Sequence, residues 1–280
     1  MATRSSPGSE QGSVHAAVDR ATNSDAFEHV ARAGFAASGV LHLLIAYIVL
    51  QLAFTGAGAN ADQSGALATL AGQTGGKIAL WVAAVGLVAL GLWRIAEAVI
   101  GSKPGERSGA NDDNPAWKRA KSLGLALANF AIALSAARFA MGSGQSSGQQ
   151  NAGMSAQLMQ SGWGKAMLIG VGLGVIAVGG YHVYKGVSQK FLDDLRGSGG
   201  TAVIGIGLTG YAAKGLVLAG AGLLVIIATL QADPSKATGI DAAVKTLGQA
   251  PFGKFLLIAA ALGIAAFGVY SFIRSRSARM

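Results

Sequence analysis

The chain has 280 residues, of which 51% are hydrophobic and only 12% are charged, and its formal net charge is +9. Charged residues make up about a quarter of an ordinary soluble domain, so this composition excludes most soluble classes and indicates a membrane protein. The basic residues are spread between apolar stretches, which argues against nucleic acid as a partner, and the lack of cysteine excludes disulfides and thiolate chemistry.

The predicted elements begin after a polar leader, residues 1–33, which we expect to lie in the cytoplasm and not to be a cleavable signal peptide. Residues 14–30 fit either a helix on the membrane surface or a disordered segment. A bilayer core of about 30 Å requires roughly 20 mostly apolar residues in a helix. Six stretches reach that length, covering residues 34–54, 77–100, 122–141, 165–187, 211–230 and 254–273.

The distribution of basic residues predicts the orientation of these spans. Sixteen of the 22 Lys and Arg residues fall on the side that holds both termini and the loops at 101–121 and 188–202. Cytoplasmic loops of membrane proteins carry an excess of Lys and Arg. We therefore expect a multi-pass protein of the bacterial plasma membrane with its N- and C-termini in the cytoplasm.

Every second span opens with the same pattern, which indicates an internal repeat. The aligned Gly-Lys pairs place Lys77, Lys165 and Lys254 at spacings of 88 and 89 residues. Further along, Gly91, Gly179 and Gly268 align, then Trp93, Tyr181 and Tyr270, then Glu97, Lys185 and Arg274.

The repeat predicts an all-α integral membrane protein with six transmembrane helices. They form three tandem helix hairpins, at 34–101, 118–191 and 203–276, with pseudo-threefold symmetry along the membrane normal. Small residues are dense in the spans, for example Gly170 and Gly174 in GxxxG spacing, and we expect them to pack helices within the chain. The outer loops end in similar segments, which predict short helices and a shared cap.

Two motifs carry a resemblance to a known family. The sequence GFAASG at Gly34 returns as GYAAKG at Gly210, and the even spans share the Gly-Lys…Gly-x-Trp/Tyr frame. This pattern resembles the actinobacterial triple-repeat membrane proteins of domain-of-unknown-function family twelve-oh-six. The resemblance covers residues 31–276 and implies the fold, but no activity.

The three aligned lysines are the most regular candidate site. Lys77, Lys165 and Lys254 stand at helix N-termini, where a cation opposes the helix dipole. One interpretation is that each Gly-Lys turn holds an anion such as a lipid phosphate. The other is that each lysine lies along apolar surface and reaches the headgroups.

Other polar residues lie within or beside the spans and are weaker candidates. Arg94 and Glu97 share a helix face, and we expect them to pair. His42 is expected to bond a facing carbonyl or polar side chain; the alternative is that it ligates a haem together with His182. The remaining candidates are Lys185, Lys214, Arg138 and Arg274. Lys214 is expected at the membrane interface; the alternative is that the uncharged run before it enters the membrane, so that Lys214 is buried and needs a partner. Arg138 is expected to bond the following loop.

No catalytic motif stands in the spans, so we expect a non-enzymatic protein without a cofactor. The leading hypothesis is a scaffold or accessory subunit of an envelope or respiratory membrane complex, with membrane lipids and a larger protein complex as partners. The alternative is a small-solute or lipid-related channel or transporter built around the pseudo-threefold axis.

Overall fold

The computed structural model describes residues 25–56, 58–100, 115–197 and 199–278. In these ranges the regular structure is helical, apart from one isolated bridge between Leu195 and Ala278. The all-α prediction is therefore confirmed for the part of the chain that is described. The long helices are α2 (Asp25–Thr55), α4 (Gly76–Ile100), α5 (Pro115–Ala140), α7 (Gly162–Val187), α8 (Thr201–Gln231) and α10 (Gly253–Ser277).

Five of these helices, α2, α5, α7, α8 and α10, are long and apolar enough to cross a membrane. The expected second span coincides with α4, whose apolar stretch among the described residues, Gly76–Leu92, is shorter. Helix α8 begins ten residues before its expected span, because the uncharged run from Thr201 to Tyr211 continues the helix. Most of residues 14–30, and with them the leader alternatives, lie outside the described residues.

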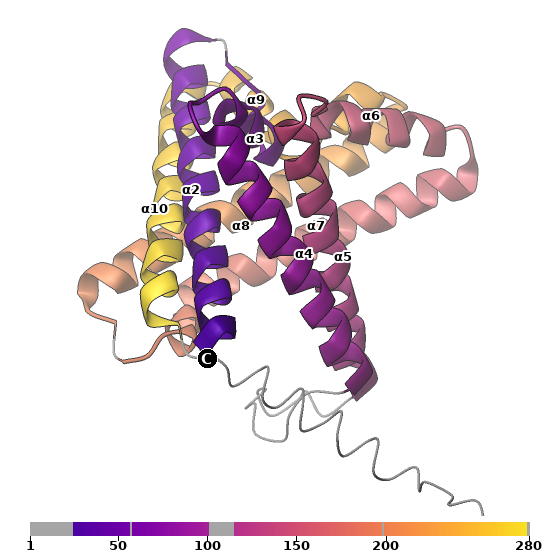
Figure 1. Ribbon diagram of the computed structural model, residues 1–280. Coiled ribbons are helices and arrows are strands. Elements are labelled where there is room, and N and C mark those ends of the chain that lie inside the picture. The colour runs from indigo at the N-terminus through magenta and orange to yellow at the C-terminus, as the bar shows by residue number, and fades with distance from the viewer. Residues whose placement is uncertain (1–24, 57, 101–114, 198, 279–280) are drawn as a thin grey trace, which may run out of the picture.

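Three short helices follow the first long helix of each repeat: α3 (Gln63–Ala71), α6 (Ser147–Leu158) and α9 (Ile240–Gln249). The expected short helices are therefore present. We call the end of the molecule that holds them the cap end, and the opposite end, with the start of α2 and the end of α10, the terminal end (Figure 1). Two 3₁₀ turns complete the chain, η1 (Lys190–Asp194) at the terminal end and η2 (Pro234–Lys236) at the cap end.

The closest helix pairs join different repeats. The second long helix of each repeat packs on the first long helix of the next, so that α4 pairs with α5, α7 with α8, and α10 with α2. Figure 1 shows the last of these pairs, with α10 running alongside α2. Within the first two repeats the two long helices pack less closely, since α2 and α4 touch only slightly and α5 and α7 scarcely at all.

Aligned glycines bring two of these pairs into backbone contact. A Cβ added at Gly179 would lie 2.6 Å from the carbonyl oxygen of Gly215, and one added at Gly268 would lie 3.1 Å from that of Gly39. Gly39 and Gly215 are the last glycines of the GFAASG and GYAAKG motifs. The recurring motifs are thus the two sides of one helix contact. In the third pair, Gly91 faces the ring of Phe130 instead.

The α7–α8 contact follows a seven-residue spacing and not the GxxxG spacing. Gly172 and Gly179 meet Gly222 and Gly215, whereas Gly170 would have no heavy atom within 4 Å of an added Cβ. Gly174 is equally open. The expectation that Gly170 and Gly174 pack helices within the chain was therefore wrong; residues seven apart, about two helical turns, share the face that makes the contact.

The glycine of each Gly-Lys pair is required by the short helix that precedes it. An added Cβ at Gly76, Gly164 or Gly253 would lie 1.7, 2.0 or 2.1 Å from a carbonyl oxygen near the end of α3, α6 or α9. Only glycine leaves room for this approach. Four residues later the side chain turns into the core in every repeat, as Leu80, Leu168 and Leu257.

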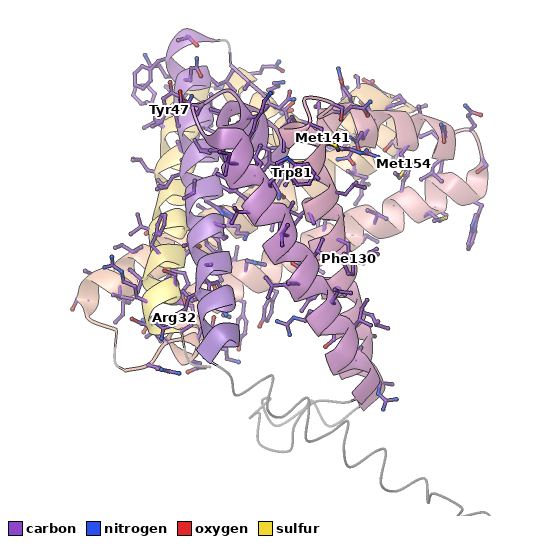
Figure 2. All side chains as sticks on the ribbon, in the orientation of Figure 1. Arg32, Tyr47, Trp81, Phe130, Met141 and Met154 are labelled. Atoms are coloured by element: carbon purple, nitrogen blue, oxygen red, sulfur yellow. The ribbon has the colours of Figure 1, made fainter. Side chains whose placement is uncertain are left out.

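Large apolar side chains cover much of the outside of the bundle. Tyr47, Trp81 and Met154 are among the exposed ones labelled in Figure 2. In water such a surface would be strongly unfavourable. The exposed side chains of the long helices therefore suit a hydrocarbon environment, as expected for a membrane-spanning protein.

Candidate functional site

Five of the expected site residues come together in the terminal half of the bundle. His42 lies on α2, His182 and Lys185 on α7, Lys214 on α8 and Arg274 on α10, so all three repeats contribute. We call this group, with the rings and the carboxylate that it contacts, the terminal cluster. Its members are His42, His182, Lys185, Phe191, Asp194, Tyr211, Lys214, Phe267, Tyr270 and Arg274.

Two aligned cations of the terminal cluster make the same contact with the next repeat. Lys185 Nζ lies 5.5 Å from the ring centroid of Tyr211, and Arg274 Cζ lies 4.3 Å from that of Phe35. Tyr211 and Phe35 occupy the same place in the GYAAKG and GFAASG motifs. A cation over a ring face is attracted by the ring's negative centre, so each contact helps to hold two repeats together.

The third copy of this contact departs from the pattern. The residue aligned with Lys185 and Arg274 is Glu97, an acid, whose side chain lies outside the described residues, as does the expected pair with Arg94. Arg94 itself is half-buried on α4. The aligned set is therefore a structural contact in two repeats and differs in the first.

A single carboxylate links the two cations. Asp194, in η1, accepts a hydrogen bond from Lys185 Nζ at 2.7 Å and lies 3.6 Å from Arg274 Nη2. The neighbouring Lys190 lies over the ring of Tyr184, and its pKa is raised, first by a hydrogen bond with the Tyr184 hydroxyl. Sequence reasoning missed Asp194, because it stands in a loop without any repeated pattern.

A buried group of rings forms the centre of the terminal cluster. Phe191 stacks on Tyr211 at 5.6 Å between centroids, and Tyr270 meets both rings edge-on. The Tyr270 hydroxyl donates a hydrogen bond to the Phe191 carbonyl oxygen at 2.7 Å. Tyr270 is only 1% exposed, whereas the aligned Tyr181 is 58% exposed, so the repeated aromatic frame has two different environments.

Lys214 and His42 both contact the ring of Phe267. Lys214 Nζ is 3.9 Å from the Phe267 ring centroid, and the His42 ring centroid is 4.7 Å from it. Helix α8 runs for thirteen residues before Lys214 and is long and apolar enough to span a membrane, so the position favours a buried lysine with a partner over one at the interface. His42 Nδ1 is 2.7 Å from the Ser38 carbonyl oxygen on its own helix, so the expected bond to a facing group is made locally instead.

The three aligned lysines are exposed at the cap end, where each begins a long helix. The preceding glycine N–H groups are already bonded, to Gln73 in the first repeat, Ser161 in the second and Ala250 in the third. These N–H groups are therefore not free to bind an anion. Lys254 lies over the Phe54 ring at 4.7 Å, a contact along apolar surface.

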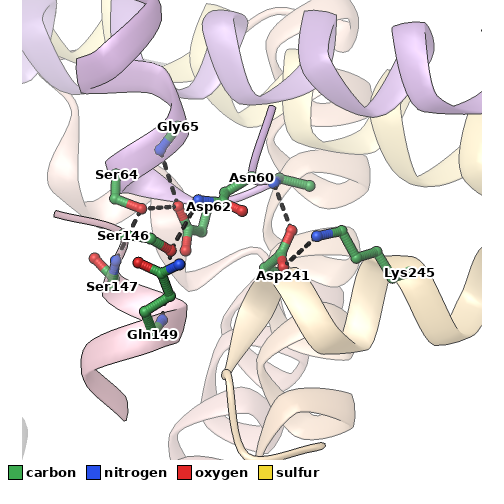
Figure 3. Close-up of polar contacts among 10 residues, drawn as sticks. Asn60, Asp62, Ser64, Gly65, Ser146, Ser147, Gln149, Asp241 and Lys245 are labelled. Atoms are coloured by element: carbon green, nitrogen blue, oxygen red, sulfur yellow. Dashed lines mark hydrogen bonds and ion pairs between the residues drawn. The ribbon is translucent and has the colours of Figure 1, made fainter. Parts of the chain in front are cut away.

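A second polar group, which we call the cap junction, joins the three repeats at the cap end (Figure 3). The Asn60 amide donates to Ser146 Oγ at 2.8 Å, and the backbone N–H of Ala61 donates to Asp241 Oδ1 at 2.8 Å. The backbone N–H of Ser147 donates to Ser64 Oγ at 3.1 Å. One segment of the first repeat is thereby bonded to both of the others.

The carboxylates of the cap junction are buried and bonded. Asp62 and Asp241 are each 5% exposed. Asp62 accepts from Ser64 and Gly65, while Asp241 also pairs with Lys245 at 2.7 Å. Buried charges are tolerated when they are paired in this way, and the result is a rigid link. In the part of the chain that the structure describes, no three His, Cys, Asp or Glu side chains are grouped for a metal ion.

These features define a class: an all-α membrane-spanning protein built from repeats that are bonded to one another at both ends. The chain belongs to the Domain of Unknown Function (DUF1206) family, whose profile matches it three times, at residues 33–101, 120–189 and 209–278. It is also similar to the uncharacterized protein YxxB of Bacillus subtilis (strain 168), with 28% identity over 87% of this chain and 88% of that protein. No solved structure matches the chain.

Proposed function

We propose that this protein is a non-enzymatic scaffold or accessory subunit of a membrane complex, in which six spanning helices form a closed pseudo-threefold ring. The protein lies in the bacterial plasma membrane with both termini in the cytoplasm, as the distribution of Lys and Arg favours. Its partners are membrane lipids and a larger membrane protein complex, in envelope or respiratory machinery.

The observation that carries this proposal is that polar contacts brace neighbouring repeats at both ends. At the cap junction the first repeat bonds to the second and the third, through Ser146 and Asp241. In the terminal cluster Asp194 contacts both Lys185 and Arg274. Alternating access requires one bundle to rock against another, which such bracing resists. A braced ring with an apolar exterior is suited to holding other membrane proteins in place.

The pairing of helices supports the pseudo-threefold arrangement. In three places the second long helix of one repeat packs on the first long helix of the next repeat, and the last of these contacts joins α10 to α2. Gly179 with Gly215 and Gly268 with Gly39 are two copies of one contact. Cross-linking aligned positions at the cap end would test the symmetry in native membranes.

The absence of cysteine makes a direct test of the scaffold possible. Asn60→Cys and Ser146→Cys together allow the cap junction to be locked with a short thiol cross-linker, and Asn60→Cys alone is the control. We expect the locked protein to co-purify with the same membrane complex in constant proportion to the unlocked protein. Loss of the complex on locking, or no stoichiometric partner in mild detergent, would contradict the scaffold.

A small-solute or lipid-related transporter is the second candidate, favoured by ionisable residues inside a span. Lys214 and His42 both contact Phe267 within the terminal cluster, and intramembrane ionisable groups often mark transport sites. Solute flux in liposomes that is lost in both Lys214→Met and the locked protein would support transport. Flux that equals that of empty liposomes would reject it.

A further inference from the structure

A polar cavity of about 310 Å³ lies beside the cap junction, between the last two turns of α5, the start of α6 and the first residue of α3. Its polar lining comes from the first and second repeats, and the terminal cluster contributes nothing to it. The polar residues are Gln63, Ser135, Arg138, Gln145, Ser147, Gln150 and Asn151.

Arg138 is the only charged side chain in this lining. The nearest acid along α3 is Asp62, whose carboxylate is taken up by Ser64 and Gly65 in the cap junction (Figure 3). The loop that follows α5 contacts the backbone of Arg138, since the backbone N–H of Ser143 donates to the Arg138 carbonyl oxygen. Arg138 thus lines the cavity together with amide and hydroxyl side chains and without an acid among the lining residues.

This set of groups suits an anion with several oxygens. A guanidinium presents paired N–H donors that match phosphate oxygens, and the amides and hydroxyls add donors around it. The Ser147 wall is fixed in place, because its backbone N–H is bonded to Ser64 across the cap junction. A preformed wall reduces the entropy cost of binding.

The remaining lining is apolar and continues toward the expected hydrocarbon region. Ala131, Ile132 and Leu134 lie one to two turns before Arg138 on α5, and Leu134 is 53% exposed. A soluble anion would gain nothing from these side chains. A lipid would place its phosphate at Arg138 and the start of an acyl chain along Leu134. The volume is sufficient for a headgroup but small for a whole drug-sized ligand.

We propose that this cavity binds the phosphate headgroup of an anionic phospholipid from the leaflet at the cap end, with Arg138 as the phosphate ligand. The site is independent of the scaffold proposal, since it needs neither a partner complex nor a closed ring. Its occupant would seal the cap junction on the side that faces the bilayer.

Native mass spectrometry and thermal unfolding of the purified full chain, with phosphatidylglycerol or phosphatidylcholine added, test the site. We expect phosphatidylglycerol to bind and raise Tm, and Arg138→Gln to weaken this binding about tenfold or more. Lys236→Gln removes a positive charge at the cap end outside the cavity and should bind like the parent. Equal binding by Arg138→Gln and the parent would overturn the proposal.

Two further experiments test the position of the site and the need for a lipid chain. Ala131→Trp puts a bulky ring into the cavity and keeps the charge of Arg138, and it should also abolish the Tm rise, so the test stands even where Arg138→Gln folds poorly. Glycerol phosphate, which has the headgroup without chains, should compete only weakly. Competition at equal concentration would show a soluble anion site and overturn the lipid assignment. Retained binding in Ala131→Trp would place the lipid elsewhere.

Discussion

The cap end and the terminal end hold the repeats together by different means. At the cap end one device occurs three times: a short helix whose last turn lies against a glycine, followed by a buried leucine. At the terminal end the contacts are unequal, since Tyr270 is buried against the Phe191 ring whereas the aligned Tyr181 is exposed. The repeated contact at the cap end therefore defines the three-repeat architecture. The side chains at the terminal end differ between repeats, so individual residues make contacts there that the other repeats lack.

The largest effect should come from the repeated glycines. Replacing Gly76, Gly164 or Gly253 by Ala brings a Cβ against a backbone carbonyl, and we expect each to lower the unfolding free energy by about 2–3 kcal/mol. Thermal unfolding in detergent measures this. Gly170→Ala is the control, because its Cβ would meet nothing within 4 Å. A lower unfolding free energy in only one of the three variants would show that the three short-helix contacts at the cap end are not equivalent.

At the terminal end, Asp194→Asn should lower the free energy of unfolding by about 1–2 kcal/mol. The reason is that Lys185 and Arg274 would face each other without a carboxylate between them. The effect is no larger because the ion pair of Lys185 with Asp194 is partly exposed to solvent. Asp193→Asn, one residue earlier and exposed, should leave Tm unchanged. Equal Tm values for the two variants would show that Asp194 does not stabilise the packing of Lys185 and Arg274.

A smaller effect distinguishes two aligned tyrosines. Tyr270→Phe removes the hydrogen bond to the Phe191 carbonyl and should cost about 1 kcal/mol. Tyr181→Phe changes an exposed hydroxyl at the same repeat position and should cost nothing measurable. Unfolding curves for both proteins check this, and equal losses would show that the two aligned tyrosines contribute alike to stability.

The smallest effect is expected from the three exposed lysines. Changing Lys77, Lys165 and Lys254 together to Ala should shift stability by less than about 0.5 kcal/mol, because surface substitutions rarely do more. If their ammonium groups hold lipid phosphates, less anionic lipid should co-purify, as lipid mass spectrometry would show. An unchanged lipid content would leave only their contact with apolar surface, as for Lys254 on Phe54.

Much of the fold could be predicted because its signals are local. Long uncharged stretches marked the spans, and the Gly-Lys spacing marked the repeats before any contact was known. The partners of each helix were not predictable in this way. Gly170 and Gly174 have the spacing of a packing motif, yet Gly172 and Gly179 make the contact, since the choice depends on how the helix is rotated.

The candidate site was predicted in part for the same reason. His42, His182, Lys185, Lys214 and Arg274 were each noticed as polar residues in or beside apolar spans. That they meet around Tyr211 and Phe267 depends on the packing of α7 on α8 and of α10 on α2 and α8. Asp194 carried no signal, because a loop acid among other loop acids has no distinguishing pattern.

The amino-acid sequence by itself determined that the chain is helical, suited to a membrane and repeated three times, because hydrophobic length and residue spacing act within one helix. Tertiary structure alone decided that helices pair across repeats, that Asp194 joins two cations, and that a cavity opens beside Arg138. These depend on the rotation and register of helices against one another, which many side chains at distant positions set together.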